Sequence, residues 1–221
     1  MAAGLGCLAA TVLLGLVASP RGTLLDHAAA RASGRLMPPE NRLVEVLGSE
    51  VVWPSGVYLT ALLPVALTVA LLGGEARRRG LGPVLERWRW VLLALLVIPV
   101  HYALRVAFGR PGPGEIPGGG LYVGAYPSGA ALVVGLGWLL CVVVAGELRP
   151  RWRPWLVALA AVVVTVHAVA RAVTAKHWIT DIAGSYLLVA GAFLLAVAST
   201  ARGRDPAGVR PAGPRRAGSK P

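Results

Sequence analysis

The residues best suited to chemistry in this chain are Arg171, His177 and Asp181. They stand where two apolar segments meet, with five residues between the arginine and the histidine and three between the histidine and the aspartate. Charged and titratable side chains are costly beside a lipid bilayer, so their presence there indicates a functional site. Because His177 and Asp181 are four residues apart, they share one helix face if a helix begins at this point. The carboxylate would then orient the imidazole as a nucleophile, while Arg171 would hold a phosphate group through two hydrogen bonds.

A second group of polar residues lies near the ends of neighbouring apolar segments. Arg105 and Arg110 stand at the exit of one segment, and Ser128 and Gly129 follow a proline at the entrance of the next. The first turn of a helix binds anions through its backbone N–H groups, and arginines stabilise a transferring phosphoryl group. In such a cradle His177 would attack phosphorus, and water would release phosphate from the phosphohistidine. This chemistry needs no cofactor, and the sequence offers no cluster of carboxylates for a metal ion.

The composition places the chain in a membrane. Of its 221 residues, 56% are hydrophobic and 14% are charged, whereas about a quarter of the residues in a soluble domain are charged. Six apolar runs approach the roughly 20 residues that a membrane-spanning helix needs, at 3–19, 51–73, 90–108, 126–146, 155–173 and 178–200. We therefore expect an all-α integral membrane bundle of six transmembrane helices. Its parts would be a first helix with an outer loop (1–50), a core of five helices (51–200) and a disordered basic tail (201–221).

The positive charges predict the orientation of this bundle. The net charge is +12, but the basic residues fall in blocks between the apolar runs, which favours topology signals over a nucleic-acid groove. Blocks at 75–90, at 147–155 and after residue 200 carry most of the arginines, so we expect these stretches in the cytoplasm. The candidate site residues all fall at the opposite ends of their segments. This pattern predicts a multi-pass plasma-membrane protein with an extracytoplasmic site, membrane lipids as partners and no nucleic acid.

These residues resemble the motifs of the type 2 phosphatidic acid phosphatases, a family that shares its fold with the vanadium haloperoxidases. The family's third motif, Ser-Arg-x5-His-x3-Asp, is matched from Ala170 to Asp181, with alanine in place of the serine. Its second motif, Pro-Ser-Gly-His, is matched from Pro127 to Ala130, with alanine in place of the histidine. Together with the first motif, described next, three motifs stand in the right order at segment boundaries, and this indicates the family's fold.

The first motif of that family, Lys-x6-Arg-Pro, is matched in its second half by Arg110 and Pro111. Ala103 occupies the lysine position, and Arg105, two residues on, would supply the missing cation. The resemblance covers roughly residues 50–200 and implies a six-helix membrane phosphatase that acts on a lipid phosphate. It also implies that His177 is the nucleophile and that the arginines and the Pro-Ser-Gly turn bind the phosphate.

The alanine at position 130 bears on the substrate. In the family this position holds the histidine that protonates the leaving group, and the loss of a general acid costs about 10²–10⁴-fold in rate. A phosphate leaving group suffers least, because it departs as a stable anion, so Ala130 favours a lipid diphosphate over a lipid monophosphate. A polyprenyl diphosphate, the carrier recycled in bacterial envelope synthesis, fits this expectation. His101 and His167 each precede an arginine by four residues, and both are candidates for a substitute acid.

The same residues allow other interpretations. His177 and Asp181 could form a structural pair, and Arg105 and Arg110 could reach to lipid headgroups. The two candidate acids could be buried histidines that hydrogen-bond to neighbouring helices. Alanines at three motif positions favour a non-catalytic lipid-phosphate binder or assembly subunit of the same fold, and a lipid phosphotransferase is a further alternative. The sequence leaves the lipid and the oligomeric state open.

Overall fold

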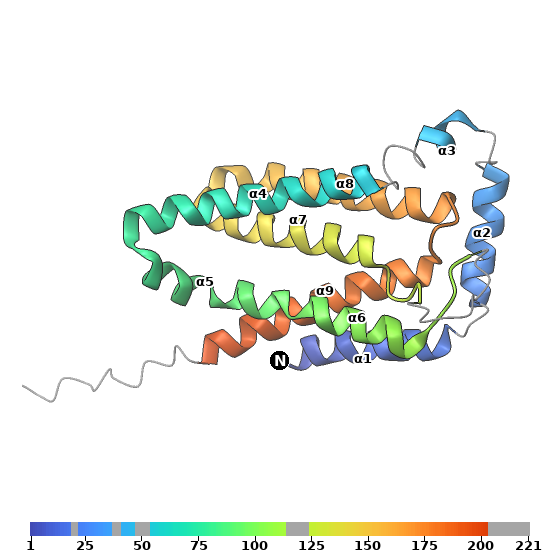
Figure 1. The fold of residues 1–221 in the computed structure, drawn as a ribbon, viewed down its shortest axis with the longest axis horizontal. Helices are drawn as coiled ribbons and strands as arrows, with labels where there is room; N and C mark the ends of the chain where they lie inside the picture. The colour runs from blue at the N-terminus through green and yellow to red at the C-terminus, as the bar shows by residue number, and fades with distance from the viewer. Residues whose placement is uncertain (19–21, 37–40, 47–53, 114–123, 203–221) are drawn as a thin grey trace, which may run out of the picture.

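The computed structural model describes residues 1–18, 22–36, 41–46, 54–113 and 124–202, and its regular structure is helical throughout these ranges (Figure 1). The helices are α1 (Ala2–Val17), α2 (Leu24–Leu36), α3 (Arg42–Val46), α4 (Pro54–Arg79), α5 (Leu81–Leu95), α6 (Val97–Phe108), α7 (Gly129–Leu148), α8 (Arg153–Val173) and α9 (Ile179–Arg202), with a 3₁₀ turn, η2 (Pro150–Trp152), before α8. The expected all-α membrane bundle is confirmed. Residues 203–221 of the expected basic tail lie outside the described residues.

Five stretches in the described ranges are long and apolar enough to cross a membrane. They are Leu59–Arg79, Leu81–Phe108, Gly129–Leu148, Pro150–Val173 and Ile179–Thr200. The first of the six expected spans corresponds to α1, which is apolar but shorter than the other five. The chain is therefore a multi-pass membrane protein built from five long spans and one short apolar helix.

The connection between the second and third spans is much shorter than the sequence predicted. The arginine-rich stretch 75–90 is helical on both sides of Gly80, where φ is 85° and the chain reverses. Hydropathy marks only the apolar part of a helix, and arginine is a good helix former, so both helices extend beyond their apolar runs. The third span is divided into α5 and α6 at Leu96, because Pro99 has no N–H to donate to the carbonyl one turn before it.

Helix α7 lies in the middle of the bundle and packs against α4, α8 and α9. One hydrophobic cluster joins α5, α7 and α9 around Trp88, Leu136 and Leu188, and a smaller one joins α4 to α7 at Trp138. Helix α1 packs along α9. Their contact needs glycine, because a side-chain carbon on Gly4 would lie 3.1 Å from the carbonyl oxygen of Gly191, and such small residues let membrane helices approach closely.

The expected outer loop at 20–50 contains two helices, α2 and α3. Figure 1 shows α2 lying across one end of the bundle, next to the end of α6 and the turn between α8 and α9. The turn between α4 and α5 lies at the opposite end (Figure 1). The described residues therefore give the bundle one end covered by a crossing helix and another rich in arginine.

Candidate active site

His177 lies in the tight turn that connects α8 to α9. A Schellman motif ends α8, in which the N–H groups of Lys176 and Ala175 donate to the carbonyls of Arg171 and Ala172, at 3.2 Å each. Such a motif requires a left-handed residue just after the helix cap, and Ala175 takes that conformation with a φ of 52°. The reversal brings His177 back beside the end of α8, which explains why five residues separate it from Arg171.

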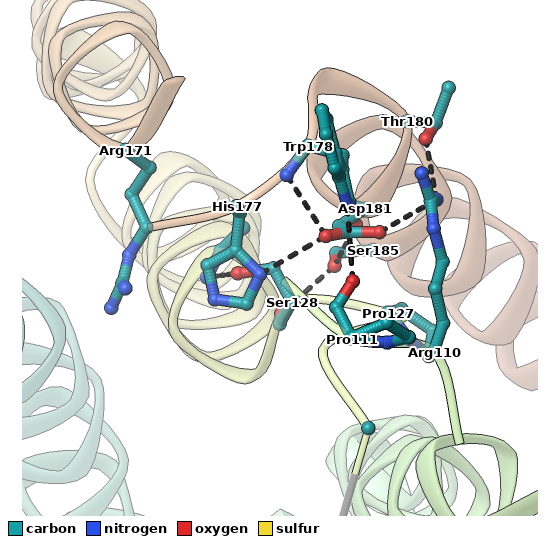
Figure 2. Close-up of polar contacts among 12 residues, drawn as sticks. Arg110, Pro111, Pro127, Ser128, Arg171, His177, Trp178, Thr180, Asp181 and Ser185 are labelled. Atoms are coloured by element: carbon teal, nitrogen blue, oxygen red, sulfur yellow. Dashed lines mark hydrogen bonds and ion pairs between the residues drawn. The ribbon is translucent and has the colours of Figure 1, made fainter. Parts of the chain in front are cut away.

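Asp181 lies in the first turn of α9 and is fully buried. Its Oδ2 accepts a hydrogen bond from the backbone N–H of Trp178 at 3.0 Å, which is half of a capping box. The same oxygen lies 3.4 Å from His177 Nδ1, a long contact of the kind that tightens when substrate binds. Because a carboxylate only accepts, Nδ1 carries the proton and Nε2 keeps its lone pair. Figure 2 shows Nε2 turned away from Asp181, toward the side on which Arg171 lies.

Burial lowers the pKa of the His177 imidazole below its ordinary value. The hydrogen bond and the charge of Asp181 oppose this shift, whereas the positive charges of Arg171 and Arg105 add to it. The imidazole is therefore neutral at neutral pH, which is the state that a nucleophile requires. The influence of both arginines on one imidazole also means that the two cations lie near it.

Arg171 and Arg105 reach this region from α8 and α6. Arg171 Nε donates to His167 Nε2 at 3.4 Å, and Arg105 Nε donates to the carbonyl of Gly124 at 2.5 Å. A side-chain carbon placed on Gly129 would lie 3.4 Å from Arg105 Nη1, so this guanidinium lies against the first turn of α7. Two like charges near one site destabilise each other unless an anion lies between them, and the arrangement therefore suits a phosphate group.

Ser128 is the N-cap of α7 and ties that helix to α9. Its N–H donates to the carbonyl of Asp181 at 3.1 Å, and its carbonyl accepts from the hydroxyl of Ser185 at 2.9 Å. Its own Oγ accepts from the N–H of Ala131 at 3.4 Å. A capped helix start still presents backbone N–H groups and the positive end of the helix dipole, so Ser128 fixes this anion-binding end beside the first turn of α9.

Arg110 is also brought to the site, but on the other side of Asp181 (Figure 2). Gly109 ends α6 in the left-handed conformation, and the chain then turns Arg110 into the protein, where it is buried. Its Nη1 donates to Asp181 Oδ1 at 2.9 Å, and its Nη2 donates to Asp26 Oδ2 at 2.7 Å. The expected phosphate contact of Arg110 stays a prediction, because in this structure its terminal nitrogens bind carboxylates.

The two histidines considered as substitute acids have different surroundings. His101 Nε2 hydrogen-bonds to the carbonyl of Pro127 at 3.0 Å, and a side-chain carbon on Gly129 would lie 3.3 Å from the His101 ring. His101 thus lies against the residue that precedes Ala130. His167 is fully buried and accepts from Arg171, and its Nδ1 has no hydrogen-bond partner in the described part of the chain.

Sequence reasoning missed Asp26, near the start of α2. The carboxylate of Asp26 is buried and accepts from Arg110, from the N–H and hydroxyl of Thr180, and from Thr23. Burial alone would raise the pKa of Asp26, but these hydrogen bonds outweigh burial and lower the pKa below its ordinary value. The sequence signal was the capping box of Thr23 and Asp26, which predicts a helix start but not the partner of the carboxylate.

A cavity of about 170 Å³ lies between α2 and the turn that carries His177. Asp26 and Ser33 line it from α2, and Ala172, His177 and Trp178 line it from the α8–α9 region. Within the described ranges, no group of three or more His, Cys, Asp or Glu residues could hold a metal ion. The cavity therefore gives His177 a small, mostly apolar space on its α2 side.

Comparison with known proteins places this arrangement in a known fold. No family model matches the chain, and no curated protein matches it significantly. A solved structure, a transmembrane PAP2-type phosphatidylglycerolphosphate phosphatase from Bacillus subtilis, superposes with a TM-score of 0.65 and 18% sequence identity, over 91% of this chain and 98% of that chain. At this level of identity the likeness establishes the fold. The chain therefore has the fold of the transmembrane PAP2-type phosphatases.

Proposed function

We propose that the protein is a membrane lipid phosphatase that works through a phosphohistidine at His177. The observation that carries this proposal is the convergence of a neutral imidazole, an orienting carboxylate on Asp181 and the positive charges of Arg105 and Arg171 that act on that imidazole. The fold supports it, because the solved structure with the same fold is named as a phosphatase of a lipid phosphate.

The reaction has two steps, phosphoryl transfer to His177 and hydrolysis of the phosphohistidine. His177 Nε2 attacks phosphorus, so that a P–N bond forms while the bond to the leaving oxygen breaks. Asp181 stabilises the imidazolium that results, and Arg105 and Arg171 stabilise the charge on the transferring oxygens, as does the N-terminal end of α7. Water then attacks phosphorus and the P–N bond breaks. Inorganic phosphate is released and the neutral imidazole is regenerated.

A lipid diphosphate is the substrate class that we favour. Its leaving group is a lipid monophosphate, which departs as a stable anion and needs little protonation. Ala130 cannot supply a proton, and the loss of a general acid costs about 10²–10⁴-fold for a basic leaving group. A polyprenyl diphosphate has the required chemistry. A lipid monophosphate, with its alkoxide leaving group, would be turned over more slowly.

His101 is the better candidate for the remaining acid. Its ring lies against Gly129, one residue from the alanine that replaces the family's histidine, and its pairing with a carbonyl keeps a proton on Nε2. His167 instead accepts a hydrogen bond from Arg171. Because an arginine side chain can only donate, we assign His167 the task of orienting that guanidinium.

The charge distribution supports a site that faces away from the cytoplasm. Arg77, Arg78 and Arg79 end α4, and Arg87 and Arg89 follow on α5, so these basic residues lie at the end opposite α2. Under the positive-inside rule that end is cytoplasmic. The site below α2 would then open to the extracytoplasmic face of the plasma membrane, where it would meet lipid headgroups.

A lipid-phosphate binder of the same fold is the second candidate. It is favoured by one observation: alanine stands at positions 103, 130 and 170, where the phosphatase motifs have lysine, histidine and serine. Such a protein would keep the cradle and release no phosphate. Bound lipid without turnover would therefore distinguish it from an enzyme.

Phosphate release by detergent-purified protein tests the proposal. We expect release from a polyprenyl diphosphate to exceed release from phosphatidic acid, and to be lost in His177→Gln and strongly reduced in Arg171→Gln. The matched control is Arg89→Gln, which removes an arginine that donates to the carbonyl of Thr200 at the other end of the bundle. Release that persists in His177→Gln would contradict the proposal, and lipid binding without release would favour the binder.

A further inference from the structure

Four charged or titratable side chains form a continuous chain from α2 to the candidate nucleophile. Asp26 Oδ2 lies 2.7 Å from Arg110 Nη2, Arg110 Nη1 lies 2.9 Å from Asp181 Oδ1, and Asp181 Oδ2 lies 3.4 Å from His177 Nδ1. The side chains of both aspartates are 0% exposed and that of Arg110 is 3% exposed. Water therefore screens these contacts weakly, and each charge depends on its neighbours.

Thr180 and Trp178 also hold Arg110 in this place. The hydroxyl of Thr180 accepts from Arg110 Nη1 at 2.7 Å and donates to Asp26 at 2.9 Å. The ring of Trp178 lies 5.7 Å from the Arg110 guanidinium carbon, and its Nε1 donates to the carbonyl of Pro111 at 3.0 Å. Arg110 is therefore fixed from α2 and from the start of α9, the helix that carries Asp181.

We propose that Asp26 is a positioning residue, which fixes Arg110 so that Arg110 orients the Asp181 carboxylate toward His177. The inference rests on the proposed function for its effect on turnover. Asp26 makes no hydrogen bond to His177 among the described contacts and is connected to it through Arg110 and Asp181. With Asp26 in place, the Arg110 guanidinium is shared between two carboxylates. Its positive charge then offsets less of the stabilisation that Asp181 gives to the imidazolium.

The charges around His177 decide whether Asp26→Asn raises or lowers the pKa of His177. Asp181 favours the imidazolium, whereas Arg171 and Arg105 disfavour it. His101 and His167 also interact with His177 electrostatically, and Asp26 shares the cavity beside it. Removing the Asp26 charge leaves Arg110 to Asp181 alone, so the imidazolium loses support and the pKa of His177 should fall further.

Enzyme kinetics of Asp26→Asn test the proposal first. We expect kcat to fall about tenfold, by analogy with the roughly 10–100-fold losses that follow removal of groups that orient the ligands of a metal site. KM should change less than twofold, because Arg105 and Arg171 are untouched, and the acidic limb of the pH profile should move to lower pH. The control is Glu75→Gln, which removes another buried carboxylate, bound by Arg87 and Trp88 at the far end of the bundle.

Two kinetic results would overturn the proposal. If Asp26→Asn lowers only the unfolding temperature, as Glu75→Gln should, and leaves kcat and the pH profile unchanged, then Asp26 is merely structural. If Asp26→Asn lowers KM or strengthens inhibition by inorganic phosphate, then Asp26 competes with phosphate for Arg110 and does not orient Asp181. Both results concern folded protein, whose amount is measured by size-exclusion chromatography.

The titration of His177 by nuclear magnetic resonance separates this inference from the proposed function. The chain has four histidines, so selective ¹³C labelling gives few signals, and His177→Gln identifies the one of interest. A lower titration midpoint in Asp26→Asn supports the inference even if the wild type releases no phosphate. An unchanged midpoint overturns the inference even if the wild type is active.

Discussion

Replacing Arg110 by leucine should destabilise the protein by about 3–5 kcal/mol at neutral pH, the usual cost of leaving buried charges without their partner. The change removes both ion pairs to Asp26 and Asp181, at 2.7 and 2.9 Å, and the hydrogen bond to Thr180. Hydrogen bonds to charged groups contribute about 1.5–3 kcal/mol each. Three such bonds would exceed the expected loss if they were additive, but Asp26 keeps its donors from Thr23 and Thr180.

The loss caused by Arg110→Leu should depend on pH. In the wild type, burial would raise the pKa of Asp26, but hydrogen bonds from Thr23, Thr180 and Arg110 hold it below the ordinary value. A carboxyl of this kind stabilises the fold above its unfolded-state pKa, about 3.9, and that stability is lost as pH falls through the folded-state pKa. Without Arg110 the buried carboxylates protonate more readily, so the difference between variant and wild type should be full at pH 7 and shrink toward pH 4.

Unfolding in mixed detergent micelles, followed by tryptophan fluorescence, measures this loss. Trp178 is a suitable probe, because its ring lies 5.7 Å from the Arg110 guanidinium carbon. Arg89→Leu is the control, since Arg89 is exposed and donates to the carbonyl of Thr200 at the other end of the bundle. A loss below about 1 kcal/mol, the range of exposed ion pairs, or a loss that is independent of pH, would refute the reasoning about the buried charges.

Three further outcomes are expected. His101→Gln should slow phosphate release from a lipid monophosphate by about 10²-fold or more but hardly affect an aryl phosphate, whose leaving group needs no acid. Adding Ala130→His should restore the lost activity. Equal effects on both substrates would argue against an acid at His101. Because burial above all lowers the pKa of His177, the acidic limb of kcat/KM should lie below the ordinary histidine value of about 6.5, and a limb above that value would contradict a buried, neutral imidazole. Ala175→Gly should change the free energy of unfolding by less than about 1 kcal/mol, whereas Ala175→Val should cost more, because a β-branched residue tolerates positive φ poorly; equal effects in unfolding experiments would count against the left-handed turn.

Hydropathy was sufficient to predict the membrane spans but not the extent of the helices. The apolar runs identify five long spans because lipid requires helical backbone over that length. The helices α4 and α5 extend into arginine-rich sequence, where the hydropathy signal vanishes although helix propensity stays high. Helix α2 was not predicted for a related reason. Its sequence mixes alanine with charged residues and has no apolar run, and the helices that it contacts, α8 and α9, lie far away in the chain.

The spacing of motif residues predicted part of the site. The pairing of His177 with Asp181 follows from their separation of four residues across the start of α9, a local relation that a sequence can express. The surroundings of Arg110 could not be predicted, because they depend on Asp26, which is 84 residues away. A sequence shows that Arg110 follows a helix, but only the fold shows which carboxylates it meets.

The most direct test of the phosphohistidine is to trap it. Purified protein would be mixed with a polyprenyl diphosphate labelled with ³²P at its terminal phosphate and quenched in base within milliseconds, because phosphohistidine survives base and is hydrolysed in acid. We expect label on the wild-type protein at His177, and none on His177→Gln. Phosphate release without any labelled intermediate, or label that persists in His177→Gln, would contradict His177 as the nucleophile.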